Sequence, residues 1–193
     1  MKVKEKANLK SLEERGYKNT IGKTYYKDLC VSILNDGEGT MKVQLIFNPH
    51  RHRGLVILNT IIEGKFPETD GYVNEEILIP VEALKKEIES FIKLGIVDEK
   101  ENINTLFKEN NRVLEELDDL FYEDVETEDF SGGSGEKNIS LIMDPDGSKK
   151  GVFFNTQFEG TIDEDEEYIS EEIHITVEKA LLTIEAVNEK RQK

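Results

Sequence analysis

Several segments in the first half of the chain alternate apolar and polar residues, or are rich in β-branched and apolar residues, as β-strands are. In one of them, Val43, Leu45 and Phe47 fall on the same side of an extended backbone. The last segment ends at Pro80, which lacks the N–H that a central strand would need to continue. The segments predicted to form strands are 29–34, 41–47, 55–64 and 75–80.

Helical periodicity follows the last of these strands. Leu84, Ile88 and Phe91 are spaced four and three residues apart, which predicts an amphipathic helix over residues 81–95. A shorter helix is expected before the first strand, over residues 7–16. Both segments end in glycine, the residue that most often terminates a helix.

The second half of the chain repeats the first. Adding 96 to a residue number leads from residues 25–92 to residues 121–188 without a gap. The turns "NDGEGT" and "SGGSGE" correspond, so the second is a hairpin turn of the repeat and not a linker. The two domains predicted are residues 1–97 and 98–193. The landmarks common to both copies are Pro49 and Pro145, Asn59-Thr60 and Asn155-Thr156, Glu63-Gly64 and Glu159-Gly160, Tyr72 and Tyr168, and Glu75-Glu76-Ile77 and Glu171-Glu172-Ile173.

The strongest helix signal lies between the two copies. Residues 102–121 place their apolar side chains on one stripe, which predicts a long central helix packed across both lobes. After it, the first strand of the second copy becomes the acidic segment 125–130, which is expected to be a charged edge or a disordered loop and not a central strand. The apolar stripe consists of Ile103, Leu106, Phe107, Val113, Leu114, Leu117, Leu120 and Phe121.

These elements together predict an α+β fold. It is a tandem duplication of a small unit, each made of a helix, a four-stranded and mainly antiparallel sheet, and a second helix. Two copies are too few for an open solenoid. We therefore expect two lobes related by a pseudo-twofold axis, or one sheet continued across both copies, with the central helix joining the lobes.

Charge is distributed unequally between the copies. Residues 1–97 contain 15 basic and 14 acidic side chains and residues 98–193 contain 10 and 27, so their net charges of +1 and −17 give the total of −16. Nine carboxylates and no basic residue occur from Glu115 to Asp129, and seven of the ten residues from Asp163 to Glu172 are acidic. Like charges so close repel one another. They indicate either a solvated surface or a face that meets a charged partner.

A dense carboxylate surface presents negative oxygens to Lys and Arg much as a nucleic-acid backbone does. The expected function is that of a non-enzymatic acidic interaction protein, an inhibitor of the nucleic-acid-mimic (DNA mimic) type carried by phages or mobile elements against host defence. Its expected partner is a host protein with a basic nucleic-acid-binding surface. The residues expected to contact that partner are Glu115, Glu116, Asp118, Asp119, Asp163, Glu164, Asp165, Glu166 and Glu167.

Two alternatives remain open: a nucleic-acid-binding module that uses the basic hairpin tips of the first copy, and an unassigned structural or interaction protein. One of these tips is "HRHR" at residues 50–53, where His50 and His52 point the same way in an extended chain, as two metal ligands would. However, Arg51 and Arg53 oppose a cation. The second copy has "DPDGSKKG" instead, which lacks the full set of calcium-loop ligands. An exposed turn is therefore favoured over a metal site.

No catalytic residue and no cofactor are predicted. Cys30 lies in an apolar strand and corresponds to Glu126, which favours an inert thiol. The common hydrolase, nucleotide-binding and zinc signatures are absent. No apolar stretch fits a membrane span or a signal peptide, so we expect a cytoplasmic protein without membrane contact.

Overall fold

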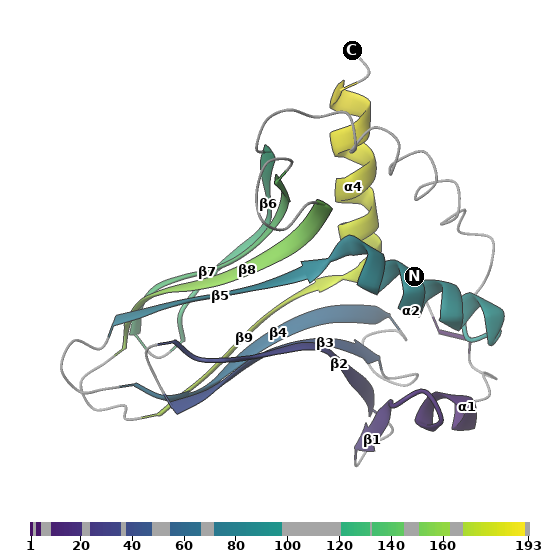
Figure 1. The fold of residues 1–193 in the computed structure, drawn as a ribbon, viewed down its shortest axis with the longest axis horizontal. Helices are drawn as coiled ribbons and strands as arrows, with labels where there is room; N and C mark the ends of the chain where they lie inside the picture. Colours follow the sequence, from purple (N-terminus) through teal and green to yellow (C-terminus); the bar gives the residue numbers. More distant parts are fainter. Residues whose placement is uncertain are drawn as a thin grey trace.

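The fold is described from a computed structural model (Figure 1). The structure describes residues 1, 3–4, 9–20, 24–35, 38–47, 55–66, 72–97, 121–131, 133–144, 151–162 and 168–191. The first repeat contains α1 (Lys10–Glu13), β1 (Lys18–Thr20), β2 (Thr24–Ile33), β3 (Glu38–Phe47), β4 (Val56–Lys65), β5 (Tyr72–Pro80) and α2 (Val81–Lys93). The second contains β6 (Phe121–Asp129), β7 (Gly133–Asp144), β8 (Gly151–Ile162), β9 (Tyr168–Thr176) and α4 (Val177–Arg191).

The order of elements confirms the duplication. β5 and β9 begin and end 96 residues apart, and a helix follows each of them directly. Even an irregularity is repeated, because the pairing register shifts between Asp28 and Cys30 in β2 and between Asp124 and Glu126 in β6. A β-bulge at the same place in both copies indicates a common backbone and not only a common sequence pattern.

The pairing of the strands differs from the expectation that each repeat forms a sheet of its own. One sheet, here called sheet I, has the order β1-β2-β3-β4-β9, and the other, sheet II, has the order β5-β8-β7-β6. All described pairs are antiparallel. The fourth strand of each repeat therefore completes the sheet of the other repeat, because the chain crosses from one sheet to the other after β4 and after β8.

The two sheets lie face to face, with α2 and α4 at the end where the sheets diverge (Figure 1). β5 lies over β2 and β3 of its own repeat while its backbone pairs with β8 of the other. β9 has the equivalent position over β6 and β7. The repeats are thus interlocked, and neither sheet is complete without both.

A buried hydrogen bond marks the centre of this arrangement. The Oγ1 atoms of Thr60 in β4 and Thr156 in β8 lie 2.9 Å apart, and these residues are 96 positions apart in the chain. Their side chains are 1% and 2% exposed. A contact between equivalent residues lies on the symmetry axis that relates them. The expected pseudo-twofold axis therefore passes between the two threonines.

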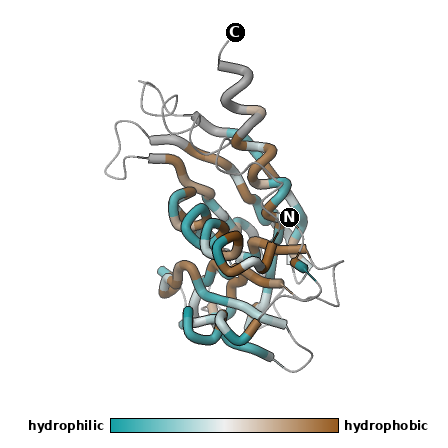
Figure 2. Tube along the Cα trace, turned by 90° about the vertical axis from the view of Figure 1, so that its right-hand side faces the viewer, coloured by the Kyte–Doolittle hydropathy of each residue, from teal (hydrophilic) through white to brown (hydrophobic). Residues whose placement is uncertain are grey.

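Burial follows the predicted hydrophobic pattern. The alternation along β3 buries Val43, Leu45 and Phe47, and α2 buries Leu84, Ile88 and Phe91. Hydrophobic and hydrophilic residues alternate around the coil of α2 (Figure 2). The ring of Phe91 lies 5.5 Å from that of Phe47 and 5.5 Å from that of Tyr17, measured between centroids. These aromatic pairs fix α2 at its end of sheet I.

Tyr17 also connects α2 to the strands through polar atoms. Its hydroxyl donates to Glu87 at 2.8 Å, and Lys27 of β2 donates to the same carboxylate at 2.5 Å. Burial of the ring and the negative charge of Glu87 raise the pKa of the Tyr17 hydroxyl well above its usual value. Both α1 and α2 end before a glycine with positive φ, Gly16 at 84° and Gly95 at 65°, as the sequence indicated.

Two expectations for the second repeat have different outcomes. Residues 102–120 of the predicted central helix lie outside the described residues, and its last residue, Phe121, is the first residue of β6 instead. In the acidic segment 125–130, residues 125–129 are part of β6, the edge strand of sheet II. The prediction of a charged edge is therefore confirmed, and the alternative prediction of a disordered loop is wrong.

The threonine pair provides a test of the interlocked arrangement. Changing Thr60 to Val should lower the free energy of unfolding by about 1–2 kcal/mol, because the buried hydroxyl of Thr156 then loses its partner. The double change of Thr60 and Thr156 to Val should cost less than the sum of the two single changes, since no hydroxyl is left unpaired. Urea unfolding of the four proteins measures this. Strictly additive losses would show that the two hydroxyls do not interact.

Candidate functional site

The carboxylates that the sequence singled out as partner contacts are not placed by the structure. Glu115, Glu116, Asp118 and Asp119 lie outside the described residues, as do Asp163 to Glu167 and the basic tip at 50–53. The remaining part of the first acidic run forms β6 and is described. The candidate site is therefore built from sheet II.

The alternation of β6 sends its carboxylates to both sides of sheet II. Glu126 and Glu128 turn inward, where they lie 2.5 Å from Nζ of Lys179 and 3.6 Å from Nζ of Lys137. Asp124 and Asp129 turn outward and are exposed. One acidic run in the sequence thus becomes two rows, and in β6 the described lysine contacts are made by Glu126 and Glu128 of the inner row.

The outward carboxylates of β6 continue across the sheet. Asp129 is in register with Glu136 of β7, which is in register with Glu159 of β8. Neighbouring strands lie about 4.8 Å apart, so these three carboxylates form one closely spaced row. The exposed carboxylates on this outer surface, here called the acidic face, are Glu76, Asp124, Asp129, Glu136 and Glu159.

The described partners of the acidic face are neutral. Asp124 accepts a hydrogen bond from Asn138 at 2.8 Å. Glu159 accepts from the Tyr72 hydroxyl at 2.6 Å, which raises the pKa of that hydroxyl. No Lys or Arg of the described residues occupies an outward position in β5, β6, β7 or β8.

The equivalent outer surface of sheet I has a different character. There Lys42 and Lys65 stand where sheet II has Asn138 and Thr161, and Lys42 lies 3.6 Å from Glu63. Ile33, 77% exposed, stands in place of Asp129. The two repeats therefore share their backbone but present unlike outer surfaces, one mixed and partly apolar, the other acidic.

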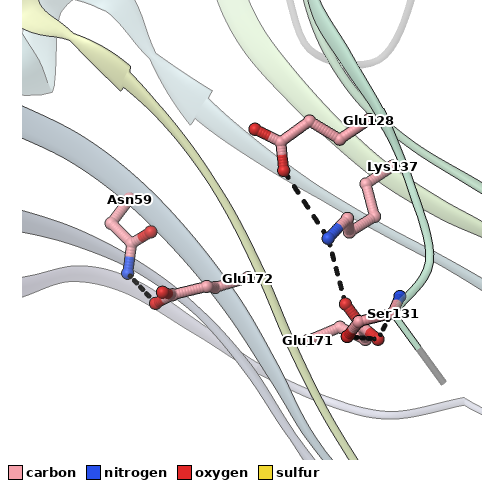
Figure 3. Close-up of polar contacts among 6 residues, drawn as sticks. All are labelled: Asn59, Glu128, Ser131, Lys137, Glu171 and Glu172. Carbon is pink, nitrogen blue, oxygen red and sulfur yellow. Dashed lines mark hydrogen bonds and ion pairs between the residues drawn. The ribbon is translucent and has the colours of Figure 1, made fainter.

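A second polar feature lies between the sheets, where the buried side chains of Lys137 and Glu171 meet (Figure 3). Nζ of Lys137 donates to Glu171 at 3.0 Å and lies 3.6 Å from Glu128. Glu171 also accepts from the backbone N–H of Ser131 at 2.8 Å and from its hydroxyl. Burial alone would raise the pKa of Glu171, but the hydrogen bonds from Ser131 and Lys137 outweigh it and hold that pKa below 4.5.

The first repeat explains which part of this cluster the fold requires. Glu75, the counterpart of Glu171, accepts from the backbone N–H of Asn35 at 2.6 Å, so in each repeat a buried carboxylate reaches across the sandwich and holds the β2–β3 or β6–β7 turn. Met41 stands where the second repeat has Lys137. The lysine is thus an addition of the second repeat.

The sequence contained evidence for the buried carboxylates Glu75 and Glu171, although counting charges did not reveal it. Glu75-Glu76 and Glu171-Glu172 are identical in both copies, and in each pair the first glutamate falls on the buried side of its strand. The other candidates remain unremarkable: Cys30 is partly buried against the core, and His174 is exposed beside Asn59. Within the described ranges, no three His, Cys, Asp or Glu side chains gather as metal ligands.

Comparison with known proteins found no similar protein. No protein-family model matches the chain, and no curated protein or solved structure is significantly similar to it. The helices in the described part of the chain lack the length and apolar character needed to cross a membrane.

Lys137 allows a test of the buried cluster by pH. Because the pKa of Glu171 is lowered in the folded state, its carboxylate contributes stability that is complete above 4.5 and is lost as the pH falls through the folded-state pKa. The change Lys137→Met should lower the free energy of unfolding by about 3 kcal/mol near neutral pH, and by less as the pH falls through the pKa of Glu171 and its carboxylate takes up a proton.

The matched control is Lys179→Met, which removes the same charge from the more exposed pair with Glu126. It should cost about 0–1 kcal/mol, since exposed ion pairs contribute little. Denaturant unfolding over a pH series measures both variants. Equal losses in the two variants, without pH dependence, would contradict the role assigned to Lys137.

Proposed function

We propose that this protein is a non-enzymatic inhibitor that binds, through carboxylates, a protein surface built to hold nucleic acid. The acidic face of sheet II carries the proposal. Asp124 and Asp129 of this face belong to the first acidic run of the sequence. The carboxylates at 115–119 and 163–167 lie outside the described residues and are also part of the proposed contact.

The energetic cost of the acidic face supports a role in binding. Like charges directly opposite one another in neighbouring strands destabilise a sheet. Asp129, Glu136 and Glu159 are three such residues in one row, and none has a lysine or arginine partner among the described residues. The equivalent row of sheet I has Ile33 and Thr40 in place of Asp129 and Glu136 and keeps only Glu63, so the fold does not require three carboxylates in a row.

The rigidity of sheet II supports mimicry of a nucleic-acid backbone in particular. The carboxylates project from paired strands and not from a loop, so their spacing is fixed before a partner arrives. A preformed array loses little conformational entropy on binding. Phosphate-binding Lys and Arg side chains of a partner meet negative oxygens on such a face without a conformational change in the protein.

The test is a comparison of charge reversals on equivalent positions of the two sheets. The double change Glu136→Lys and Glu159→Lys should abolish capture of partner proteins from a host lysate, and rising salt should weaken capture by the unchanged protein. The control is Glu63→Lys, which reverses the charge at the counterpart of Glu159 and should leave capture unchanged. A captured protein must also lose its nucleic acid when this protein is added.

Direct nucleic-acid binding is measured in parallel on the unchanged protein and on an Arg51→Ala and Arg53→Ala variant. Tight binding that disappears in this variant, with capture insensitive to the reversals on the acidic face, would reject the proposal in favour of a nucleic-acid-binding module. Capture that survives all these changes would reject both functions.

A further inference from the structure

A cleft of 530 Å³ lies beside the buried lysine cluster. On one side it is lined by Ser170, Glu172 and His174 of β9, and on the other by Glu128 and Lys137 of sheet II. Glu171, which points to the opposite side of β9 from these three residues, also lines it. A cleft that contacts both sides of a strand opens at the edge of that strand.

The edge of β9 is a free edge in the described part of the chain. β9 pairs with β4 from Tyr168 to Thr176, and no described strand pairs with it on its other side. The unpaired N–H and C=O groups of such an edge are a template for an added strand. The cleft therefore combines space, backbone hydrogen-bonding groups and charged side chains in one place.

The charges of the cleft indicate what kind of strand it accepts. The lining of the cleft contains three carboxylates, Glu128, Glu171 and Glu172, and one lysine, which forms its shortest contact with Glu171. Glu172 is exposed and accepts one hydrogen bond from the Asn59 amide at 3.3 Å (Figure 3). The side chain of Glu128 is 41% exposed. Both have oxygens left for a cation, so the cleft favours a lysine or arginine side chain over an acidic or purely apolar one.

The first repeat shows that this character is not imposed by the fold. The same place beside β5 has Ser32 instead of Glu128 and Met41 instead of Lys137, while Glu76 replaces Glu172. The pair of carboxylates on opposite walls therefore occurs in the second repeat alone. β5 offers a free edge without that pair, which makes it an internal control.

We propose that the cleft along β9 binds an extended basic segment of a partner protein by strand addition. The backbone of the segment pairs with the free edge of β9, and lysine or arginine side chains of the segment contact Glu128 on the inner side of the strand and Glu172 on its outer side. This site is separate from the acidic face, so it does not rest on the function proposed above.

The test uses the full chain and a lysine–valine peptide with the length of β9, 9 residues, whose lysines project to both sides when the peptide is extended. The peptide should bind, and hydrogen exchange should slow at the backbone amides of β9. Combined Glu128→Gln and Glu172→Gln changes should weaken binding about tenfold or more, since charge-assisted hydrogen bonds are lost. A glutamate–valine peptide should not bind, and a lysine–proline peptide should not protect β9, because proline lacks the N–H for pairing.

The control variant is Glu76→Gln, the same change at the position equivalent to Glu172, and it should leave peptide affinity unchanged. Equal weakening by Glu76→Gln and Glu172→Gln, or protection of β5 instead of β9, would overturn the cleft as the binding site. Binding that is lost only in the Glu136→Lys and Glu159→Lys variant would also overturn it, while leaving the acidic face intact as a proposal. Absence of any binding or protection rejects the cleft alone.

Discussion

Cross-repeat strand pairing is the constraint on which the rest of this structure depends. Sheet I lacks an edge strand without β9, and β5 has no described strand partner other than β8. A duplicated unit of this size buries little apolar surface alone, whereas two interlocked units share one interior. The chain therefore gains a core common to both repeats.

Polar residues inside this core determine its register. The hydroxyls of Thr60 and Thr156 meet on the pseudo-twofold axis, and Glu75 and Glu171 hold the equivalent turns at 35 and 131 from across the sandwich. A strand displaced by one residue would turn each of these groups to the wrong side and leave buried polar atoms without partners. The same displacement would also turn the apolar side chains of the strand to solvent, so the polar and apolar positions together specify one register.

The outer surfaces had no such constraint, and there the two repeats have diverged. Outward positions of sheet I carry Lys42, Lys65 and Ile33, while those of sheet II carry neutral or acidic residues. Inward, charged differences occur in matched pairs: Cys30 and Ala83, both packed against the core, correspond to the ion pair of Glu126 and Lys179, and Ser32 and Met41 correspond to Glu128 and Lys137. The outward carboxylates of sheet II have no lysine or arginine partner among the described residues, and that contrast directs attention to the surface of the second repeat.

The sequence by itself determined the duplication, the four strands expected in the first copy, and α2 with its terminal glycine, because local periodicity and composition encode them. For the acidic segment that became β6 it left a charged edge and a loop both open. It did not determine which sheet β5 and β9 join. Their alternation, Val73, Glu75 and Ile77 in β5, buries one side equally well in either sheet, so only long-range packing decides. The bulges at Asp28 and Asp124 shift the alternation. Which carboxylates of β6 face Lys137 and Lys179, and which face solvent, was therefore settled by tertiary structure alone.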